Sequence, residues 1–102
     1  MSDARITVEE LRGTRGIRLL DIRKRPSDQQ IPGSERCDGI ELESGAYVPF
    51  TKEEAVVVYC GSGNSCTRIA DQYAHQGYNI RALEGGFAAW TDQGGALEDR
   101  SY

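Results

Sequence analysis

Residues 56–68 constrain the fold of this chain more than any other stretch, and they read VVVYCGSGNSCTR. A continuous apolar run ended by a glycine loop is typical of a strand that is buried on both faces of a sheet. A helical pattern begins directly after the loop, so the stretch predicts a strand, a loop and a helix in succession. In an open parallel sheet, ligands bind at the carboxyl ends of the strands. Cys60, which follows the strand, is therefore predicted to lie where chemistry usually takes place.

Short strands and short helices alternate along the rest of the chain. Thr7 and Glu10 have the spacing of a capping box, which predicts a brief helix over Val8–Arg12. Pro26 suits the first turn of a short helix in the polar residues 24–30. Further strands are expected near Ile6 and over residues 17–22, 35–42 and 80–83, a turn over residues 31–34, a loop over residues 43–54, and further helices over residues 65–76 and 87–91. This alternation indicates an α/β domain with a mainly parallel sheet.

The length and the charge of the chain restrict its class. A chain of 102 residues corresponds to one domain, for which we expect a core over residues 4–94 and a polar, frayed tail over residues 95–102. The net charge of −4 argues against nucleic acid as a partner. The N-terminal segment lacks a signal-peptide core, and no apolar run approaches the roughly 20 residues that span a bilayer. We therefore expect a soluble, cytoplasmic protein that does not bind membranes.

The cysteines point to reactive or buried thiols. Cys37, Cys60 and Cys66 form an odd set without C-x-x-C spacing, which argues against a disulfide framework. His75 is the only histidine, so a structural zinc site is poorly supported and no metal is expected. Neither a base nor a glycine loop adjoins Cys37, and this cysteine is expected to be a small core residue.

The loop that begins at Cys60 consists of small residues: Gly61, Ser62, Gly63, Asn64 and Ser65. Its glycines allow the backbone to curl tightly. A curled loop that leads into a helix points successive N–H groups inward and forms a nest for an anion. Such a field lowers the pKa of a cysteine from about 8.5 toward roughly 3.5–7.5. Cys60 is therefore predicted to be a thiolate nucleophile, and the alternative is a buried structural cysteine at the end of a core strand.

Four segments of the chain together resemble one protein family. They are residues 19–23 (LLDIR), residues 31–34 (IPGS), residues 59–63 (YCGSG) and residues 84–90 (EGGFAAW). In this order they are similar to motifs of the rhodanese-like sulfurtransferases, and the resemblance covers about residues 4–94. It implies a three-layer α/β domain with a central, mainly parallel five-stranded sheet that is flanked by helices on both faces.

The resemblance also implies a function. Cys60 would take a sulfane sulfur from a donor as a persulfide, held by the loop residues 61–65, and pass it to a thiophilic acceptor such as cyanide or a thiol. Asp21 and Arg23 match the family's Asp-x-Arg signature and would support the site, with Asp21 holding backbone amides of a neighbouring loop. No metal or organic cofactor is implied. The expected partners are a small-molecule sulfur donor and a thiol acceptor, and a protein donor or acceptor is a further option.

The loop carries no charged residue, whereas many relatives that use thiosulfate have arginine or lysine there. This difference favours a low-molecular-weight or protein persulfide over thiosulfate as the donor. Two interpretations of Cys66 stay open, because it could pack inward or act as a resolving thiol for Cys60.

Two other function classes compete with sulfur transfer. The first is a non-catalytic module that binds a partner or senses redox state through Cys60 and Cys66. The second is a phosphatase or arsenate reductase, which is disfavoured because cysteine phosphatases use Cys-x5-Arg and Arg68 lies too far from Cys60. Arg68 is instead expected to be a solvated helix residue.

Overall fold

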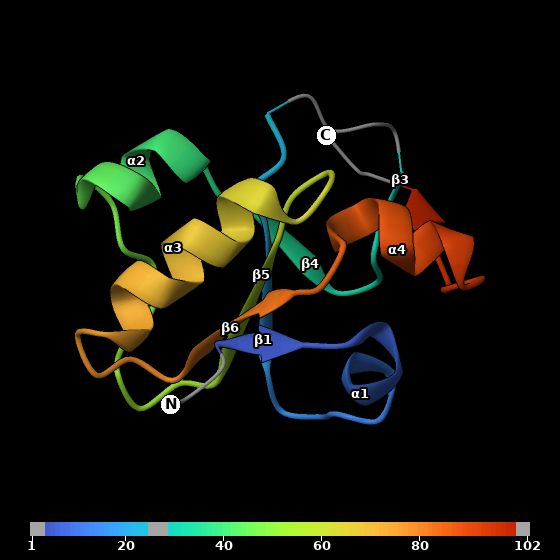
Figure 1. Ribbon diagram of the computed structural model, residues 1–102, viewed down its shortest axis with the longest axis horizontal. Coiled ribbons are helices and arrows are strands. Elements are labelled where there is room, and N and C mark those ends of the chain that lie inside the picture. The colour runs from blue at the N-terminus through green and yellow to red at the C-terminus, as the bar shows by residue number, and fades with distance from the viewer. Residues whose placement is uncertain (1–3, 25–28, 100–102) are drawn as a thin grey trace.

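Five parallel strands form the central sheet of the structure, a computed structural model that describes residues 4–24 and 29–99. They are β1 (Arg5–Ile6), β2 (Arg18–Asp21), β4 (Ser34–Arg36), β5 (Val56–Tyr59) and β6 (Ile80–Leu83). Their order is β1–β6–β5–β2–β4, and every neighbouring pair is parallel (Figure 1). The predicted five-stranded sheet is confirmed. Because all its strands run the same way, their carboxyl ends share one edge.

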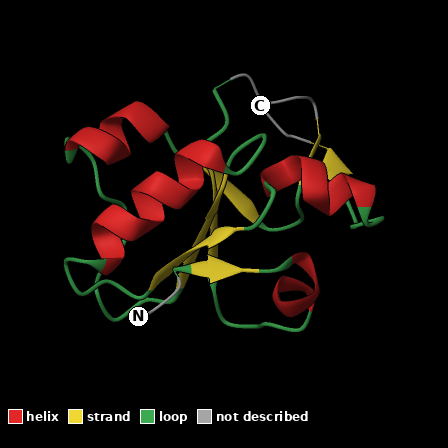
Figure 2. Cartoon of the chain, viewed as in Figure 1, coloured by secondary structure: helices red, strands yellow, loops and turns green. Residues whose placement is uncertain are grey.

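Helices cover both faces of this sheet (Figures 1 and 2). They are α2 (Gly39–Ser44) and α3 (Asn64–Ala74) on one face, and α1 (Val8–Arg12) and α4 (Gly86–Asp92) on the other. The predicted three-layer α/β architecture is therefore confirmed. None of the helices in the described part of the chain has the length and apolar character that crossing a bilayer requires.

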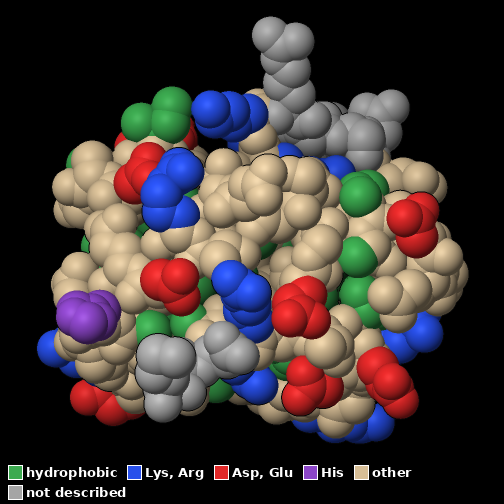
Figure 3. Space-filling model, viewed as in Figure 1, with side chains coloured by type: hydrophobic (Ala, Val, Ile, Leu, Met, Phe, Trp, Pro, Cys, Tyr) green, Lys and Arg blue, Asp and Glu red, His purple; other side chains and the backbone are tan. Residues whose placement is uncertain are grey.

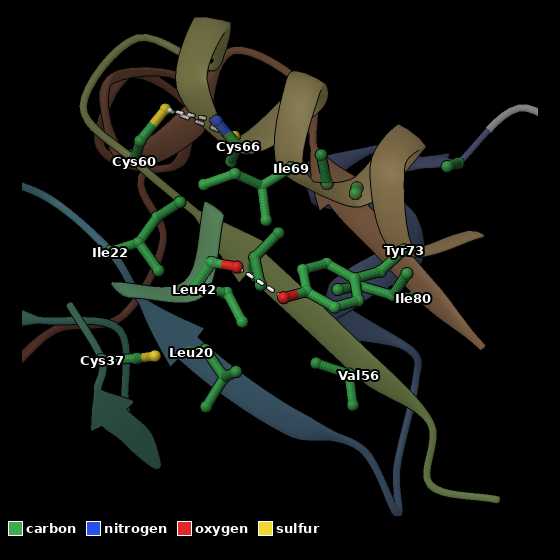
Figure 4. Close-up of a cluster of buried hydrophobic side chains, with 14 of the residues drawn as sticks. Leu20, Ile22, Cys37, Leu42, Val56, Cys60, Cys66, Ile69, Tyr73 and Ile80 are labelled. Carbon is green, nitrogen blue, oxygen red and sulfur yellow. Dashed lines mark hydrogen bonds between the residues drawn. The ribbon is translucent and has the colours of Figure 1, made fainter. Parts of the chain in front are cut away.

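Strand β5 lies at the centre of the sheet, and its side chains contribute to the hydrophobic cores on both sides. Val56 and Val58 belong to the core beneath α2 and α3, which Figure 4 shows, and Val57 and Tyr59 belong to the opposite core. All four residues are at most 2% exposed, because β2 and β6 flank the strand and helices cover both faces. The prediction of a strand buried on both faces is confirmed. The same alternation places Cys60 in the core on the α3 side.

Two helix ends follow the local signals in the sequence. The Thr7 hydroxyl accepts the Glu10 N–H at 3.1 Å, and the Glu10 carboxylate accepts the Thr7 N–H at 3.0 Å, which confirms the capping box. After α3, Gly77 takes a φ of 95°, and the Tyr78 N–H donates to the Tyr73 carbonyl. Glycine directly after the last turn is the local signal here, because it takes this left-handed conformation readily.

The prediction of a strand within residues 35–42 is wrong for the second half of this stretch, where a helix forms instead. Strand β4 covers only Ser34–Arg36, and α2 occupies Gly39–Ser44, so it also includes the first residues of the predicted loop. The cause is Asp38, whose carboxylate accepts the backbone N–H groups of Ile40 and Glu41 at 2.8 and 3.3 Å. An aspartate in this position is an N-cap, and it starts the helix.

The prediction of a frayed tail over residues 95–102 is also partly wrong. Glu98–Asp99 forms strand β7, which pairs antiparallel with β3 (Gln29–Gln30). The Glu98 carboxylate additionally accepts the backbone N–H of Gly33 at 2.6 Å. This part of the tail is held by a segment about 65 residues away in the sequence, which a local pattern does not report.

Strand β3 also replaces the end of the short helix predicted over residues 24–30. Pro26, on which that prediction depended, lies outside the described residues. The predicted turn over residues 31–34 is present, and Gly33 takes a φ of 83° within it.

Candidate active site

Cys60 lies at the carboxyl edge of the sheet, directly after the last residue of β5. A pocket of about 520 Å³ opens beside it. The walls of the pocket come from the loop after β5, from the segments that follow β2 and β4, and from residues of α2 and α3. Cys60 is only 6% exposed, so its sulfur is accessible from the pocket and otherwise enclosed by protein.

The start of α4 holds the backbone of the Cys60 loop. The Phe87 N–H donates to the Cys60 carbonyl at 2.7 Å, and the Ala88 N–H donates to the Gly61 carbonyl at 3.0 Å. Gly86 permits this approach, because it takes a φ of 62° and a Cβ there would lie 2.5 Å from the Cys60 carbonyl oxygen. Since α4 binds the carbonyl groups, amide hydrogens of the loop are free to face the Cys60 sulfur.

Hydrogen-bond donors of the loop and of α3 surround the Cys60 sulfur. The backbone N–H of Gly63 lies 3.1 Å from it. The backbone N–H and the sulfur of Cys66 lie 3.4 and 3.3 Å from it, as Figure 4 shows. Gly63 takes a φ of 98°, and a Cβ there would lie 3.0 Å from the backbone nitrogen of Gly85. The loop therefore curls into the anion-binding arrangement that its glycines and small residues predict.

The two neighbouring cysteines share one negative charge. The pKa of Cys60 is lowered to about 5, because the hydrogen bond from the Cys66 thiol and the backbone N–H groups of Cys66, Gly63 and Ser65 together outweigh the opposing effect of burial. The same hydrogen bond and burial raise the pKa of Cys66, because its proton is held by the Cys60 thiolate. At neutral pH the pair therefore consists of a Cys60 thiolate and a Cys66 thiol, the form in which Cys60 is nucleophilic.

Replacing Cys66 with alanine is expected to make Cys60 less acidic. The variant keeps the backbone N–H donors but loses the thiol donor, and a hydrogen bond to a charged group contributes about 1.5–3 kcal/mol. The pH midpoint of Cys60 alkylation by iodoacetamide should therefore rise from about 5 by roughly one to two pH units. Mass spectrometry of the Cys60 peptide across a pH series measures this midpoint. An unchanged midpoint would show that the Cys66 thiol does not stabilise the thiolate.

Asp21 and Arg23 form a buried ion pair beside the loop. Arg23 Nη2 lies 2.7 Å from Asp21 Oδ2, and the Arg23 backbone N–H donates to Asp21 Oδ1 at 2.9 Å. The Asp21 side chain is fully buried and that of Arg23 is 6% exposed. The Arg23 guanidinium lies over the Phe87 ring, 4.0 Å from its centroid, and so connects the end of β2 to α4. Asp21 thus accepts the backbone N–H of Arg23 in its own segment and also binds the charged side chain of that residue.

Charged side chains reach the pocket from elements other than the loop, and the sequence motifs did not identify them as pocket residues. They are Lys24, Arg36 and Arg68, together with Asp38 and Glu43. Arg68 pairs with Glu43 at 2.5 Å and is exposed, as expected for a solvated helix residue. Lys24 and Arg36 lie at the ends of β2 and β4, so their place at the carboxyl edge was the signal that could have located them. Basic and acidic side chains are also interspersed over the face of the molecule shown in Figure 3.

The remaining predicted residues divide between the pocket, the surface and the core. Gly61, Ser62 and Ser65 line the pocket, whereas Asn64 begins α3 and is exposed. Cys37 is 3% exposed in the core, and burial raises the pKa of its thiol. The described residues contain no group of three or more His, Cys, Asp and Glu side chains that could hold a metal ion.

The match with a protein family extends over most of the chain. The family model of the rhodanese-like domain matches residues 6–93, which include the Cys60 loop, the Asp21–Arg23 pair and the start of α4. The chain belongs to the rhodanese-like domain family. No curated protein sequence matches this rhodanese-like domain significantly.

Solved structures share the fold of this rhodanese-like domain. A rhodanese-related protein from Thermoplasma volcanium superposes with a TM-score of 0.79 at 21% identity, covering 92% of this chain and 96% of that one. A rhodanese-like domain protein from Staphylococcus aureus gives a TM-score of 0.78 at 23% identity, covering 95% and 98%. A protein of unknown function from Rhodopseudomonas palustris, described as a possible tyrosine phosphatase, gives 0.74 at 29% identity, covering 92% and 83%.

Proposed function

We propose that this rhodanese-like domain is a sulfurtransferase in which Cys60 carries the transferred sulfur as a persulfide. The observation that supports this most directly is the position of the Cys60 sulfur, which accepts two backbone N–H groups beside an open pocket. These donors stabilise a thiolate before the reaction, and they are preorganised for the negative charge of a persulfide after it. The transfer needs neither a metal nor an organic cofactor.

The reaction proceeds in two nucleophilic steps. The Cys60 thiolate attacks the outer, sulfane sulfur of the donor, the bond between that sulfur and the rest of the donor breaks, and a thiolate or sulfite leaves. The outer sulfur of the Cys60 persulfide then carries the negative charge. In the second step a thiolate or cyanide attacks this outer sulfur, and Cys60 leaves as a thiolate again. A covalent intermediate of this kind corresponds to ping-pong kinetics.

The pocket favours an organic persulfide as the donor. Its charged residues have both signs: the acidic ones are Asp38 and Glu43, and the basic ones are Arg23, Lys24, Arg36 and Arg68. Ile40, which is 67% exposed, adds an apolar surface at the same pocket. A small thiol persulfide that carries both carboxylate and ammonium groups matches this mixture better than thiosulfate, which is only anionic.

A phosphatase function has less support. The Rhodopseudomonas palustris neighbour is described as a possible tyrosine phosphatase. In this chain, however, Arg68 lies eight residues after Cys60 in the sequence, and its guanidinium is paired with Glu43 at 2.5 Å. It is therefore not part of a short loop that closes around a phosphate on Cys60.

Incubation with glutathione persulfide, and separately with thiosulfate, tests the proposal. In the Cys66→Ala variant, in which Cys60 is the remaining thiol of the site, we expect the mass of the folded protein to increase by about 32 Da, one sulfur atom, before an acceptor or reductant is added. The increase should be faster with glutathione persulfide, and added cyanide should remove it as thiocyanate. The Cys37→Ala variant serves as the control, because it removes a buried thiol outside the pocket.

Two results would contradict sulfur transfer. A folded protein that takes up no sulfur from either donor would instead support a partner-binding or redox-sensing module. Hydrolysis of an aryl phosphate that depends on Cys60 would support the phosphatase class.

A further inference from the structure

The side chains of Cys60 and Cys66 are in direct contact, and sulfur transfer by Cys60 alone uses Cys66 only as a hydrogen-bond donor to the thiolate. Their sulfur atoms lie 3.3 Å apart (Figure 4). Reacting atoms about 3–3.5 Å apart are at the distance of a near-attack conformer. Cys37 offers a contrast, because its sulfur has a weak contact of 3.9 Å with the Asp38 carbonyl.

Cys66 is enclosed by protein, so its chemistry is restricted to Cys60. Its side chain is fully buried in the core with Ile69 and Ala70. The other polar contact of its sulfur is the Leu83 carbonyl at 3.9 Å. A thiol from solution can approach Cys60 through the pocket, whereas Cys66 does not line that pocket. Cys66 is therefore in place to react with a Cys60 persulfide, whereas an external acceptor must first enter the pocket.

We propose, building on the sulfurtransferase function above, that Cys66 resolves the Cys60 persulfide and releases hydrosulfide. The Cys66 sulfur attacks Cys60 Sγ, the bond between Cys60 Sγ and the outer sulfur breaks, and the Cys66 proton moves to the outer sulfur. A persulfide anion and a thiol thus become a disulfide and HS⁻. The outer sulfur gains two electrons, and each cysteine sulfur loses one. This gives the chain a second activity, the reduction of sulfane sulfur to hydrosulfide.

The hydrogen bond between the two cysteines prepares this step. In the resting protein the Cys66 thiol donates a hydrogen bond to the Cys60 thiolate. Cys66 therefore keeps its proton and is unreactive. Once Cys60 binds an outer sulfur, the negative charge lies on that outer sulfur, and Cys60 Sγ becomes an electrophile. The proton that Cys66 must lose then has an anionic acceptor, the sulfur that departs. A dithiol, or two molecules of a small thiol, afterwards reduces the disulfide from the pocket side, where Cys60 is accessible.

A single-turnover experiment tests the proposal with the full chain. The reduced protein is freed of thiols, loaded with glutathione persulfide and analysed by intact mass, by peptide mapping without reductant and by hydrosulfide release. The wild-type protein should release about one hydrosulfide per chain and become about 2 Da lighter than the reduced form, with a Cys60–Cys66 disulfide. The Cys66→Ser variant keeps a hydroxyl donor beside Cys60. This variant should remain about 32 Da heavier than its own reduced form, and its hydrosulfide release should be at least about nine tenths lower than that of the wild-type protein.

Further variants separate this proposal from the proposed function. Cys37→Ala should behave as the wild-type protein, and Cys60→Ser should give the background release of the donor. If the wild-type protein stays about 32 Da heavier and releases no more hydrosulfide than Cys66→Ser, resolution by Cys66 is wrong and sulfur transfer stands. If the wild-type protein takes up no sulfur and forms no Cys60–Cys66 disulfide, both proposals are wrong. Cys66→Ala should repeat the result of Cys66→Ser, which guards against an effect of the new hydroxyl.

Discussion

Replacing Cys60 with serine is expected to lower the turnover of sulfur transfer to cyanide by about 10⁴-fold or more. The serine hydroxyl would lie among the same N–H donors, but its oxygen forms no persulfide, and the covalent intermediate is lost. Steady-state formation of thiocyanate with glutathione persulfide as donor measures the effect. The loop backbone should keep its shape, because its carbonyl groups are bound by α4 rather than by the cysteine side chain.

The matched control for this loss is Cys37→Ala, which also removes one buried thiol. Cys37 lies outside the pocket, so we expect the turnover of that variant to resemble that of the wild-type protein. If Cys60→Ser keeps turnover within about tenfold of the wild-type value, Cys60 is not the sulfur carrier. A role for the domain in partner binding would then be the better explanation.

Replacing Asp21 with asparagine is expected to lower the free energy of unfolding by about 3–5 kcal/mol. The change keeps the size of the side chain but leaves the Arg23 guanidinium, only 6% exposed, without its buried carboxylate. Removing one partner of a buried ion pair is strongly destabilising, because the lost attraction acted in a region of low dielectric constant. Denaturation in urea, followed by circular dichroism, measures the change in the unfolding free energy.

Two further variants show whether the loss of the Asp21 charge is the cause. Asp71→Asn changes an exposed aspartate on α3 and should alter the unfolding free energy by no more than about 0.5 kcal/mol. The double variant Asp21→Asn with Arg23→Gln removes both charges and should regain part of the loss. If the losses of unfolding free energy caused by the two single substitutions simply add in the double variant, the lost charge interaction is not the cause. The contact of Arg23 with Phe87 would then be the more important one.

Much of the candidate site could be predicted because its signals are local. The unbroken apolar run of β5 identified the strand that carries Cys60, and the run's burial on both faces follows from its composition. The two glycines and small residues after Cys60 predicted a curled loop, because few other residues allow a φ of 98° at Gly63. Thr7 and Glu10 predicted a helix start in the same way, since both partners lie within one turn.

The prediction of secondary structure failed where one side chain or one distant segment had more influence than the local hydrophobic pattern. Asp38 ends a strand and starts α2 through two hydrogen bonds of its own side chain, although the surrounding residues read as a strand. Strand β7 exists because Glu98–Asp99 pairs with Gln29–Gln30 across most of the chain's length. Hydrophobic periodicity reports which face of an element is buried, and it carries no information about a polar segment's distant partner.

Local patterns in the sequence are sufficient to predict the parallel sheet, the position of Cys60 at its carboxyl edge and the glycine loop that follows. The packing of the elements is needed to show that Lys24 and Arg36 line the pocket and that the Cys66 sulfur lies 3.3 Å from that of Cys60. The physical reason is that the strand and the loop depend on the conformational preferences of neighbouring residues. The charges of the pocket and the contact of the two sulfurs depend instead on how β2, β4, α3 and α4 pack around the end of β5.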